Sequence, residues 1–125
     1  MGSLPRISEA EWLVMKSLWS KGQLTANEIV EELAAKTKWK PKTIKTLIHR
    51  LLKKKAIRFE REGRGYRYYP AVSQNECVRQ ERTSFARRVY GGAMKPMLAE
   101  FLEDADLSTK DVADLKKILD QKGRK

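Results

Sequence analysis

Residues 41–69 restrict the fold more than any other part of this chain, because helical spacing is followed at once by hairpin spacing. Pro41 suits a first helical turn, since its φ is fixed and it has no N–H to leave unpaired. The apolar residues after it recur at the i, i+3, i+4, i+7 and i+8 spacing that places them on one helix face: Ile44, Leu47, Ile48, Leu51 and Leu52. We therefore predict an amphipathic helix from Pro41.

A β-hairpin is predicted directly after this helix. Apolar and charged residues alternate over 57–61, and the tyrosine-rich segment 66–69 follows a turn that contains two glycines. Alternation around such a turn is typical of two antiparallel strands. Pro70 is expected to end the second strand, because proline donates no hydrogen bond to a neighbouring strand.

Four Ser/Thr-x-x-Glu/Asp segments mark further helix starts, at Ser8, Thr25, Ser73 and Ser108. In this capping box the hydroxyl accepts from the backbone N–H three residues on, and the acid reaches back to the cap's own N–H. With the apolar periodicity and the glycine stops, they predict these helices in addition to the one from Pro41: 9–20, 26–36, 74–90, 94–103 and 109–121.

Three helices followed by a hairpin is the element order of a winged helix-turn-helix. The predicted fold class is therefore mostly α with a small β-hairpin (α+β). It comprises a winged helix DNA-binding domain over residues 1–72 and a three-helix dimerisation region over residues 73–125. A short strand near Gln23 and Leu24 is predicted to pair with the hairpin as a third strand.

Positive charge is concentrated in the first half of the chain. Residues 36–67 hold 13 basic and 2 acidic side chains, whereas residues 73–125 hold 11 basic and 9 acidic ones. The formal net charge of +11 points first to nucleic acid as a partner. A basic run is often only a solvated face, but its overlap with the predicted helix and hairpin favours a binding role.

The residue content disfavours several other function classes. No apolar run approaches the roughly 18 residues of a membrane span, and the chain does not begin with the apolar stretch of a signal peptide. We therefore expect a cytoplasmic protein without membrane insertion. One cysteine and one histidine provide neither a disulfide nor a usual zinc site. We predict no catalytic residues, no metal and no cofactor, and hence no enzyme.

The polar face of the helix from Pro41 is the predicted reader of DNA. An α-helix fits the major groove, and the first turns of a recognition helix meet the base edges. Threonine can bond a base edge or contact a thymine methyl, and lysine can reach guanine O6 and N7. The predicted DNA-binding residues on this face are Lys42, Thr43, Lys45, Thr46, His49, Arg50 and Lys53.

The hairpin adds Arg61, Arg64 and Arg67 to the predicted DNA-binding residues. Arg64 stands at the tip, where it could enter a minor groove or contact phosphate. The alternative is a charged edge strand that discourages aggregation. The hairpin tyrosines could stack on single-stranded bases, but packing of the hairpin onto the helices is the favoured interpretation.

Residues 73–125 offer little core of their own, so a second copy is the predicted partner of their apolar side chains. A two-fold dimer would place two recognition helices about 34 Å apart and require a palindromic site. The alternative is packing on the first domain of a monomer. The predicted dimerisation residues are Met94, Met97, Leu98, Phe101, Val112, Leu115 and Ile118.

Several segments, taken in order, cover nearly the whole chain. They are Leu4-Pro5-Arg6-Ile7-Ser8-Glu9-Ala10-Glu11-Trp12, Thr25-Ala26-Asn27-Glu28, Trp39-Lys40-Pro41-Lys42-Thr43-Ile44-Lys45-Thr46-Leu47, Leu51-Leu52-Lys53-Lys54-Lys55, Ser84-Phe85, Arg88-Val89-Tyr90 and Phe101-Leu102-Glu103. Together they resemble the penicillinase-repressor family, BlaI/MecI. The resemblance implies a dimeric winged-helix repressor of inverted repeats with TACA/TGTA cores, in promoters of β-lactamase and related resistance genes.

The resemblance also implies residue roles. Lys42, Thr43 and Thr46 are expected to read bases, Arg50 to contact phosphate, and Arg64 to contact DNA from the hairpin. Two positions depart from the relatives, which carry glutamine at the position of Lys45 and an apolar residue at that of His49. The operator sequence is therefore open.

Repressors of this family are inactivated when a membrane-bound sensor metalloprotease signals cleavage of an Asn–Phe bond in the dimerisation helices. The aligned pair here is Glu100-Phe101, which keeps only the phenylalanine. Cleavage there and a plain core role for Phe101 are both open. The copper-responsive branch carries paired Cys-x-Cys motifs near its end, which this chain lacks, so copper sensing is disfavoured.

Two functions follow from the sequence. A dimeric repressor predicts a steep salt dependence and a sequence preference that Thr46→Ala would lose. The alternative is a winged-helix interaction module whose basic face binds RNA or an acidic protein. It predicts no preference for duplex over single strand, and a role for the tyrosines.

Overall fold

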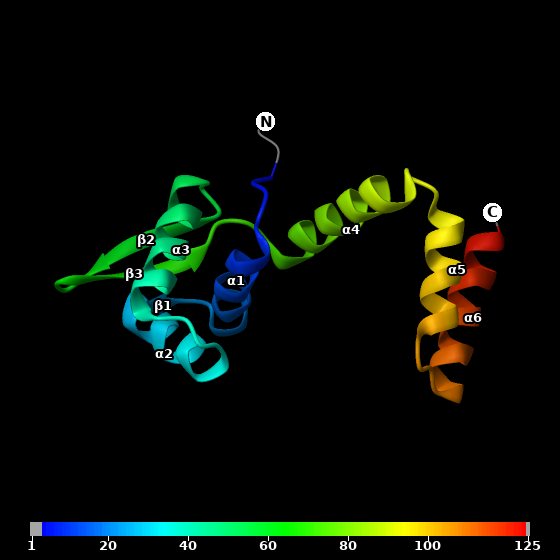
Figure 1. Ribbon diagram of the computed structural model, residues 1–125, viewed down its shortest axis with the longest axis horizontal. Helices are drawn as coiled ribbons and strands as arrows, with labels where there is room; N and C mark the ends of the chain where they lie inside the picture. The colour runs from blue at the N-terminus through cyan, green and yellow to red at the C-terminus, as the bar shows by residue number, and fades with distance from the viewer. Residues whose placement is uncertain (1–3, 125) are drawn as a thin grey trace. The chain divides into compact units, whose positions relative to one another are not determined.

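The computed structural model describes residues 4–124, in two compact units (Figure 1). The first unit ends at Arg82 and the second begins at Thr83, within one helix. Residues 1–3, which belong to the start in which no signal peptide is expected, and residue 125 lie outside the described residues. The functional boundary at residue 72 stays a prediction.

Three helices make up most of the first unit: α1 (Glu9–Lys21), α2 (Ala26–Lys36) and α3 (Pro41–Lys53). Complete capping boxes begin α1 and α2, as predicted. In the first box Ser8 Oγ accepts from the Glu11 N–H at 3.2 Å, and Glu11 Oε1 accepts from the Ser8 N–H at 2.8 Å. These bonds are local, which is why the sequence predicts both helix starts correctly.

Three short strands form an antiparallel sheet in the order β1-β3-β2. They are β1 (Leu24–Thr25), β2 (Ile57–Glu62) and β3 (Gly65–Pro70). Tyr68 of β3 pairs with Leu24 on one side and with Phe59 on the other. The predicted fold class, a winged helix-turn-helix with mostly helical structure, is therefore confirmed.

The core of the first unit lies where its helices meet the sheet and the start of α4 (Gln74–Tyr90). Its largest fully buried side chains are Met15, Leu18, Ile29, Leu33, Ile44, Leu51, Ile57, Glu11 and Val14. Trp19 Nε1 donates to the Val72 carbonyl at 3.0 Å, which ties the end of α1 to the segment after the hairpin.

The start of α4 differs from the predicted capping box. Ser73 Oγ accepts from the Glu76 N–H at 3.1 Å, as expected. Within the described chain, however, the Glu76 carboxylate accepts from the Ser73 hydroxyl at 2.9 Å instead of reaching its backbone N–H. The hydroxyl serves as both acceptor and donor, so this cap closes through the two side chains.

The second unit contains the end of α4, then α5 (Met94–Asp104) and α6 (Thr109–Gly123). Figure 1 shows α5 and α6 side by side and antiparallel. Among the described residues of this unit, the buried hydrophobic side chains are Ala86 and Met97 alone. The helices therefore bury little apolar surface within a single chain.

Candidate nucleic-acid interface

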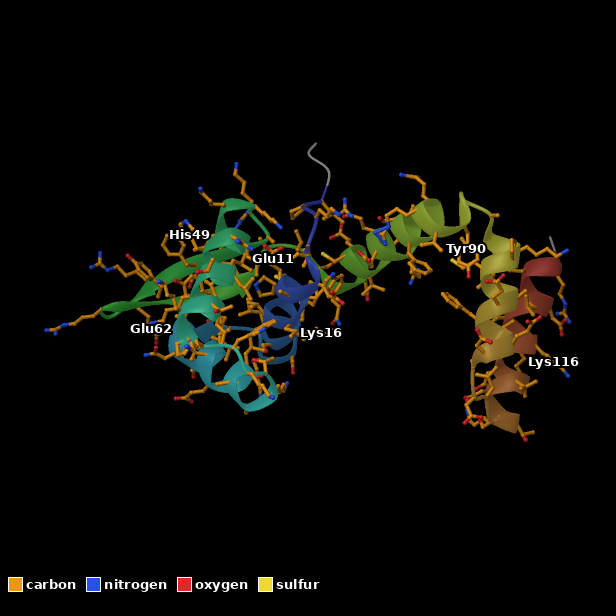
Figure 2. The ribbon with its side chains drawn as sticks, viewed as in Figure 1. Glu11, Lys16, His49, Glu62, Tyr90 and Lys116 are labelled. Atoms are coloured by element: carbon orange, nitrogen blue, oxygen red, sulfur yellow. The ribbon has the colours of Figure 1, made fainter. Side chains whose placement is uncertain are left out.

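The outer face of α3 gathers the predicted recognition residues. Ile44, Leu47, Ile48 and Leu51 are buried in the core, which turns the remaining side chains outward. Figure 2 shows His49 on this outer side. The exposed residues here are Lys42, Thr43, Lys45, Thr46, His49, Arg50 and Lys53.

A shallow hollow of about 440 Å³ lies on this face, lined by Lys42, Lys45, Thr46 and His49. The lining combines two ammonium groups, a hydroxyl and an imidazole, and it contains no carboxylate. Ammonium groups neutralise phosphate, and the other two groups exchange hydrogen bonds with base edges. The chemistry of the hollow therefore suits a groove of nucleic acid.

The hydroxyl of Thr46 is already engaged. It donates to the Lys42 carbonyl at 3.0 Å. Because a hydroxyl has one proton, Thr46 presents an acceptor lone pair and a methyl group to the outside in this rotamer. Both groups suit contact with a base edge, the methyl with thymine in particular.

A two-residue turn, Gly63-Arg64, joins the hairpin strands, because Glu62 pairs with Gly65. Gly63 has a φ of 60°, a conformation that favours glycine. Arg61 and Arg64 are exposed, and within residues 4–124 neither takes part in a salt bridge. Both guanidinium groups are therefore available to phosphate.

Arg67 differs from the other hairpin arginines, because it contacts two carboxylates. Its Nε donates to Glu62 Oε2, and its Nη1 lies 3.8 Å from Glu28 Oε1. The pKa of Glu28 is lowered mainly by the Thr25 backbone N–H, which donates at 2.8 Å, against a smaller opposing effect of burial. The Thr25 hydroxyl and Arg67 lower it further.

An ion pair between distant parts of the chain holds the C-terminal end of α3. Lys54 Nζ donates to Glu11 Oε1 at 2.5 Å and to the Arg6 carbonyl at 2.9 Å. Burial of Glu11 opposes its ionisation, but the hydrogen bonds from Lys54 and Ser8 outweigh that effect and lower its pKa. No pattern in the sequence predicts this contact, because 43 positions separate the two partners.

The aromatic residues of the hairpin contact one another. Phe59 and Tyr66 meet edge to face with ring centroids 4.9 Å apart, and Tyr68 packs against the core. Packing therefore accounts for Tyr68, as the sequence interpretation favoured. Tyr66 stays 44% exposed.

The predicted dimerisation residues lie on α5 and α6. Leu115 is half-buried, and Met97 is buried within its own unit. The other five are exposed large apolar residues: Met94, Leu98, Phe101, Val112 and Ile118. Exposed apolar side chains in such number mark an interaction surface more often than a free one.

The candidate cleavage pair, Glu100-Phe101, lies within α5. Glu100 Oε1 accepts from the Tyr90 hydroxyl at 2.7 Å, and this bond raises the pKa of Tyr90. Phe101 stacks on Phe85 with ring centroids 6.0 Å apart. The pair is thus helical and in contact with the end of α4.

Residues 4–124 hold no group of three or more His, Cys, Asp or Glu side chains that could bind a metal ion. In the same range no helix has the length and apolarity to cross a membrane. Cys77 is buried, and burial, followed by the charge of Glu76, raises the pKa of its thiol.

The chain is similar to known proteins along most of its length. Residues 7–121 match the family model described as penicillinase repressor. A penicillinase repressor of Bacillus licheniformis is 37% identical over 126 residues, covering 100% of this chain and 98% of the relative. The methicillin resistance regulatory protein MecI of Staphylococcus aureus strain N315 is 37% identical over 116 residues, covering 93% and 94%.

Two solved structures resemble a large part of the chain. One is the DNA-binding domain of the repressor BlaI, with a TM-score of 0.55 and 39% identity, covering 61% of this chain and 93% of that domain. The other is the monomeric form of Bacillus licheniformis BlaI in complex with the blaP half-operator. Its TM-score is 0.54 and its identity 39%, with the same coverage of 61% and 93%.

Proposed function

Because the chain belongs to the penicillinase repressor family, we propose that it binds a palindromic operator as a homodimer and represses transcription there. That it is a DNA-binding repressor, and not an enzyme, follows from the family. The observation that carries the proposal is the exposed face of α3, which presents Lys42, Thr46 and His49 around one hollow without a carboxylate.

The proposed contacts divide between bases and phosphates. Lys42, Thr43 and Thr46 read base edges in the major groove, and Lys45 and His49 adjust the preferred sequence from the same hollow. Cationic side chains farther along α3 and on the hairpin grip the phosphates: Arg50, Lys53, Arg61 and Arg64.

The second unit is proposed to form the dimer. Exposed apolar residues such as Ile118, at 57%, support this proposal, because the unit buries little within one chain. Ile118→Asp is expected to give a monomer in sedimentation velocity, whereas Lys116→Asp on the same helix leaves the dimer intact. A parent chain that sediments as a monomer at micromolar concentration would contradict the proposal.

The regulated genes are proposed to be of the β-lactamase or resistance type, and the operator an inverted repeat with TACA/TGTA cores. The names of the two relatives, penicillinase repressor and methicillin resistance regulatory protein, support this class. Relief of repression is proposed to follow cleavage in the dimerisation helices, signalled by a membrane sensor metalloprotease.

Cleavage at Glu100-Phe101 requires α5 to open locally, because proteases bind extended backbone. α5 has 11 residues and one buried side chain, Met97, so its opening costs little compared with global unfolding. Immunoblots of the native host before and after β-lactam exposure test this step. A repressor that stays intact while the genes are induced would refute it.

Fluorescence anisotropy of two labelled duplexes tests the main proposal. One duplex carries a TACA/TGTA inverted repeat and the other a scramble of equal composition. Specific proteins commonly exceed their non-specific affinity by about a thousandfold or more. We expect an affinity ratio of that order between the two duplexes, with two protomers bound to the inverted repeat. Thr46→Ala should reduce this ratio.

The alternative is an interaction module whose basic face binds RNA or an acidic protein. Equal binding of both duplexes and of single strands would favour it. The exposed ring of Tyr66 would then stack on bases, so Tyr66→Ala would weaken RNA binding more than Thr46→Ala.

A further inference from the structure

Arg67 belongs to an ion cluster that joins two separate elements of the first unit. It donates to Glu62 at the end of β2 and approaches Glu28 in the first turn of α2. Glu28 Oε1 is itself held by the Thr25 N–H at 2.8 Å. We call these three residues, Glu28, Glu62 and Arg67, the wing clamp.

The wing clamp has no positive charge to offer to a polyanion. One guanidinium and two carboxylates carry a formal net charge of −1, and Arg67 contacts both carboxylates. A side chain that neutralises a phosphate must present unbalanced positive charge to it. Arg67 is already balanced within the protein.

The strand register places Arg67 and Arg61 on opposite faces of the hairpin. Directly paired residues share a face and neighbours in a strand alternate. Arg61 is paired with Tyr66, whereas Arg67 is paired with Glu60. Because 61 and 60 are neighbours in β2, the two arginines lie on different faces.

The face of Arg61 is the one turned toward the recognition helix. Tyr68 lies two residues from Tyr66 and therefore shares its face. Tyr68 lines a cleft of about 240 Å³ together with Lys45 and His49 of α3. The opposite face carries Arg67 with its acidic neighbours.

We propose that Arg67 is a positioning residue for the hairpin rather than a DNA contact, an inference that rests on the proposed function. By joining Glu62 to Glu28, it ties the hairpin to the first turn of α2 and so holds Arg61 and Arg64 in place for phosphate. Glu28 and Glu62 therefore support DNA binding indirectly, by holding Arg67, although they are anionic.

The first test uses the free full-length chain and needs no DNA. Amide hydrogen exchange over residues 58–69 is compared between Arg67→Gln and the matched control Arg61→Gln. Loss of a partly exposed ion pair speeds local opening by about threefold to fivefold. Faster exchange in Arg67→Gln alone is expected, and equal exchange in both variants overturns the proposal.

The second test is the salt dependence of operator binding. Losing one phosphate contact flattens the slope of log K against log salt by about 0.9 per protomer. Arg61→Gln should flatten the slope by this amount, whereas Arg67→Gln should weaken operator binding several-fold and leave the slope unchanged. In the Arg67→Gln background, Arg64→Gln should lower the operator affinity by a smaller factor than it does in the parent. A flattened slope in Arg67→Gln overturns the proposal.

Glu62→Gln gives the sharpest contrast. Removing an anion near DNA and releasing Arg67 would tighten binding if Arg67 were a DNA contact. The clamp predicts weaker binding, because Arg67 loses the partner in β2 that holds its guanidinium beside Glu28 of α2. If the parent itself shows no operator preference, the proposed function fails, and the exchange measurement still decides whether the clamp exists.

Discussion

Replacing Lys54 by methionine should destabilise the fold by leaving a buried carboxylate without its cation. Glu11 is 1% exposed and Lys54 36% exposed. Removing one partner of a fully buried pair costs about 3–5 kcal/mol, and an exposed pair contributes about 0–1 kcal/mol. Lys54 is partly exposed, and the Ser8 N–H still donates to Glu11 after the substitution. The expected loss of unfolding free energy is therefore about 2 kcal/mol, midway between those limits.

Urea unfolding followed by circular dichroism measures this loss at one fixed protein concentration, because the stability of an oligomer depends on concentration. Lys53→Met is the matched control, since it makes the same change at an exposed neighbour. It should change the unfolding free energy by less than about 0.5 kcal/mol. If Lys54→Met behaves like Lys53→Met, the ion pair does not hold α3 as argued.

The loss should also depend on pH. The pKa of Glu11 is below its ordinary value of 4.5, so the ionised form favours folding. Its contribution is complete above that value and is lost as the pH falls through the folded pKa. The difference in unfolding free energy between the parent and Lys54→Met should therefore decrease in acid. A difference that stays constant with pH would contradict an ionic origin.

Three further outcomes are expected. Cys77, buried and with a raised pKa, should react with a thiol reagent far more slowly in the folded chain than in urea, and equal rates would mean that the start of α4 opens. Gly63→Ala should lower the unfolding free energy by about 1–2 kcal/mol, because the turn holds φ at 60°; unchanged stability in urea would show that the turn relaxes. Ser108→Ala should reduce it by about 1 kcal/mol through loss of the α6 cap, and Thr109→Ala, beside it, is the control.

Local chemistry made most of the fold predictable from the sequence. Ser8, Thr25 and Ser108 each bond a residue three positions away, and the apolar spacing after Pro41 describes the buried face of α3 without further information. The strands were predicted equally well, because alternation and a glycine turn are also local. Helix ends shifted by at most two residues.

Contacts between distant positions were not predictable. Arg67 looked like one more hairpin cation in the sequence, and only the fold brings Glu28 to it across β1. Lys54 belonged to a basic run, yet it bonds Glu11 near the start of the chain. Lys55 has a φ of 65°, a left-handed conformation that favours glycine, so the lysine in the sequence does not predict it.

The register of the hairpin also limits how this wing can change during evolution. A single-residue insertion or deletion inside β2 or β3 exchanges the two faces beyond it, because side chains alternate with period two. Arg61 would then share the face of Arg67 instead of the face of Tyr68, whereas an insertion or deletion of two residues would keep every side chain on its face. Length variants among homologous wings should therefore differ by even numbers within the strands, with odd changes confined to the Gly63-Arg64 turn.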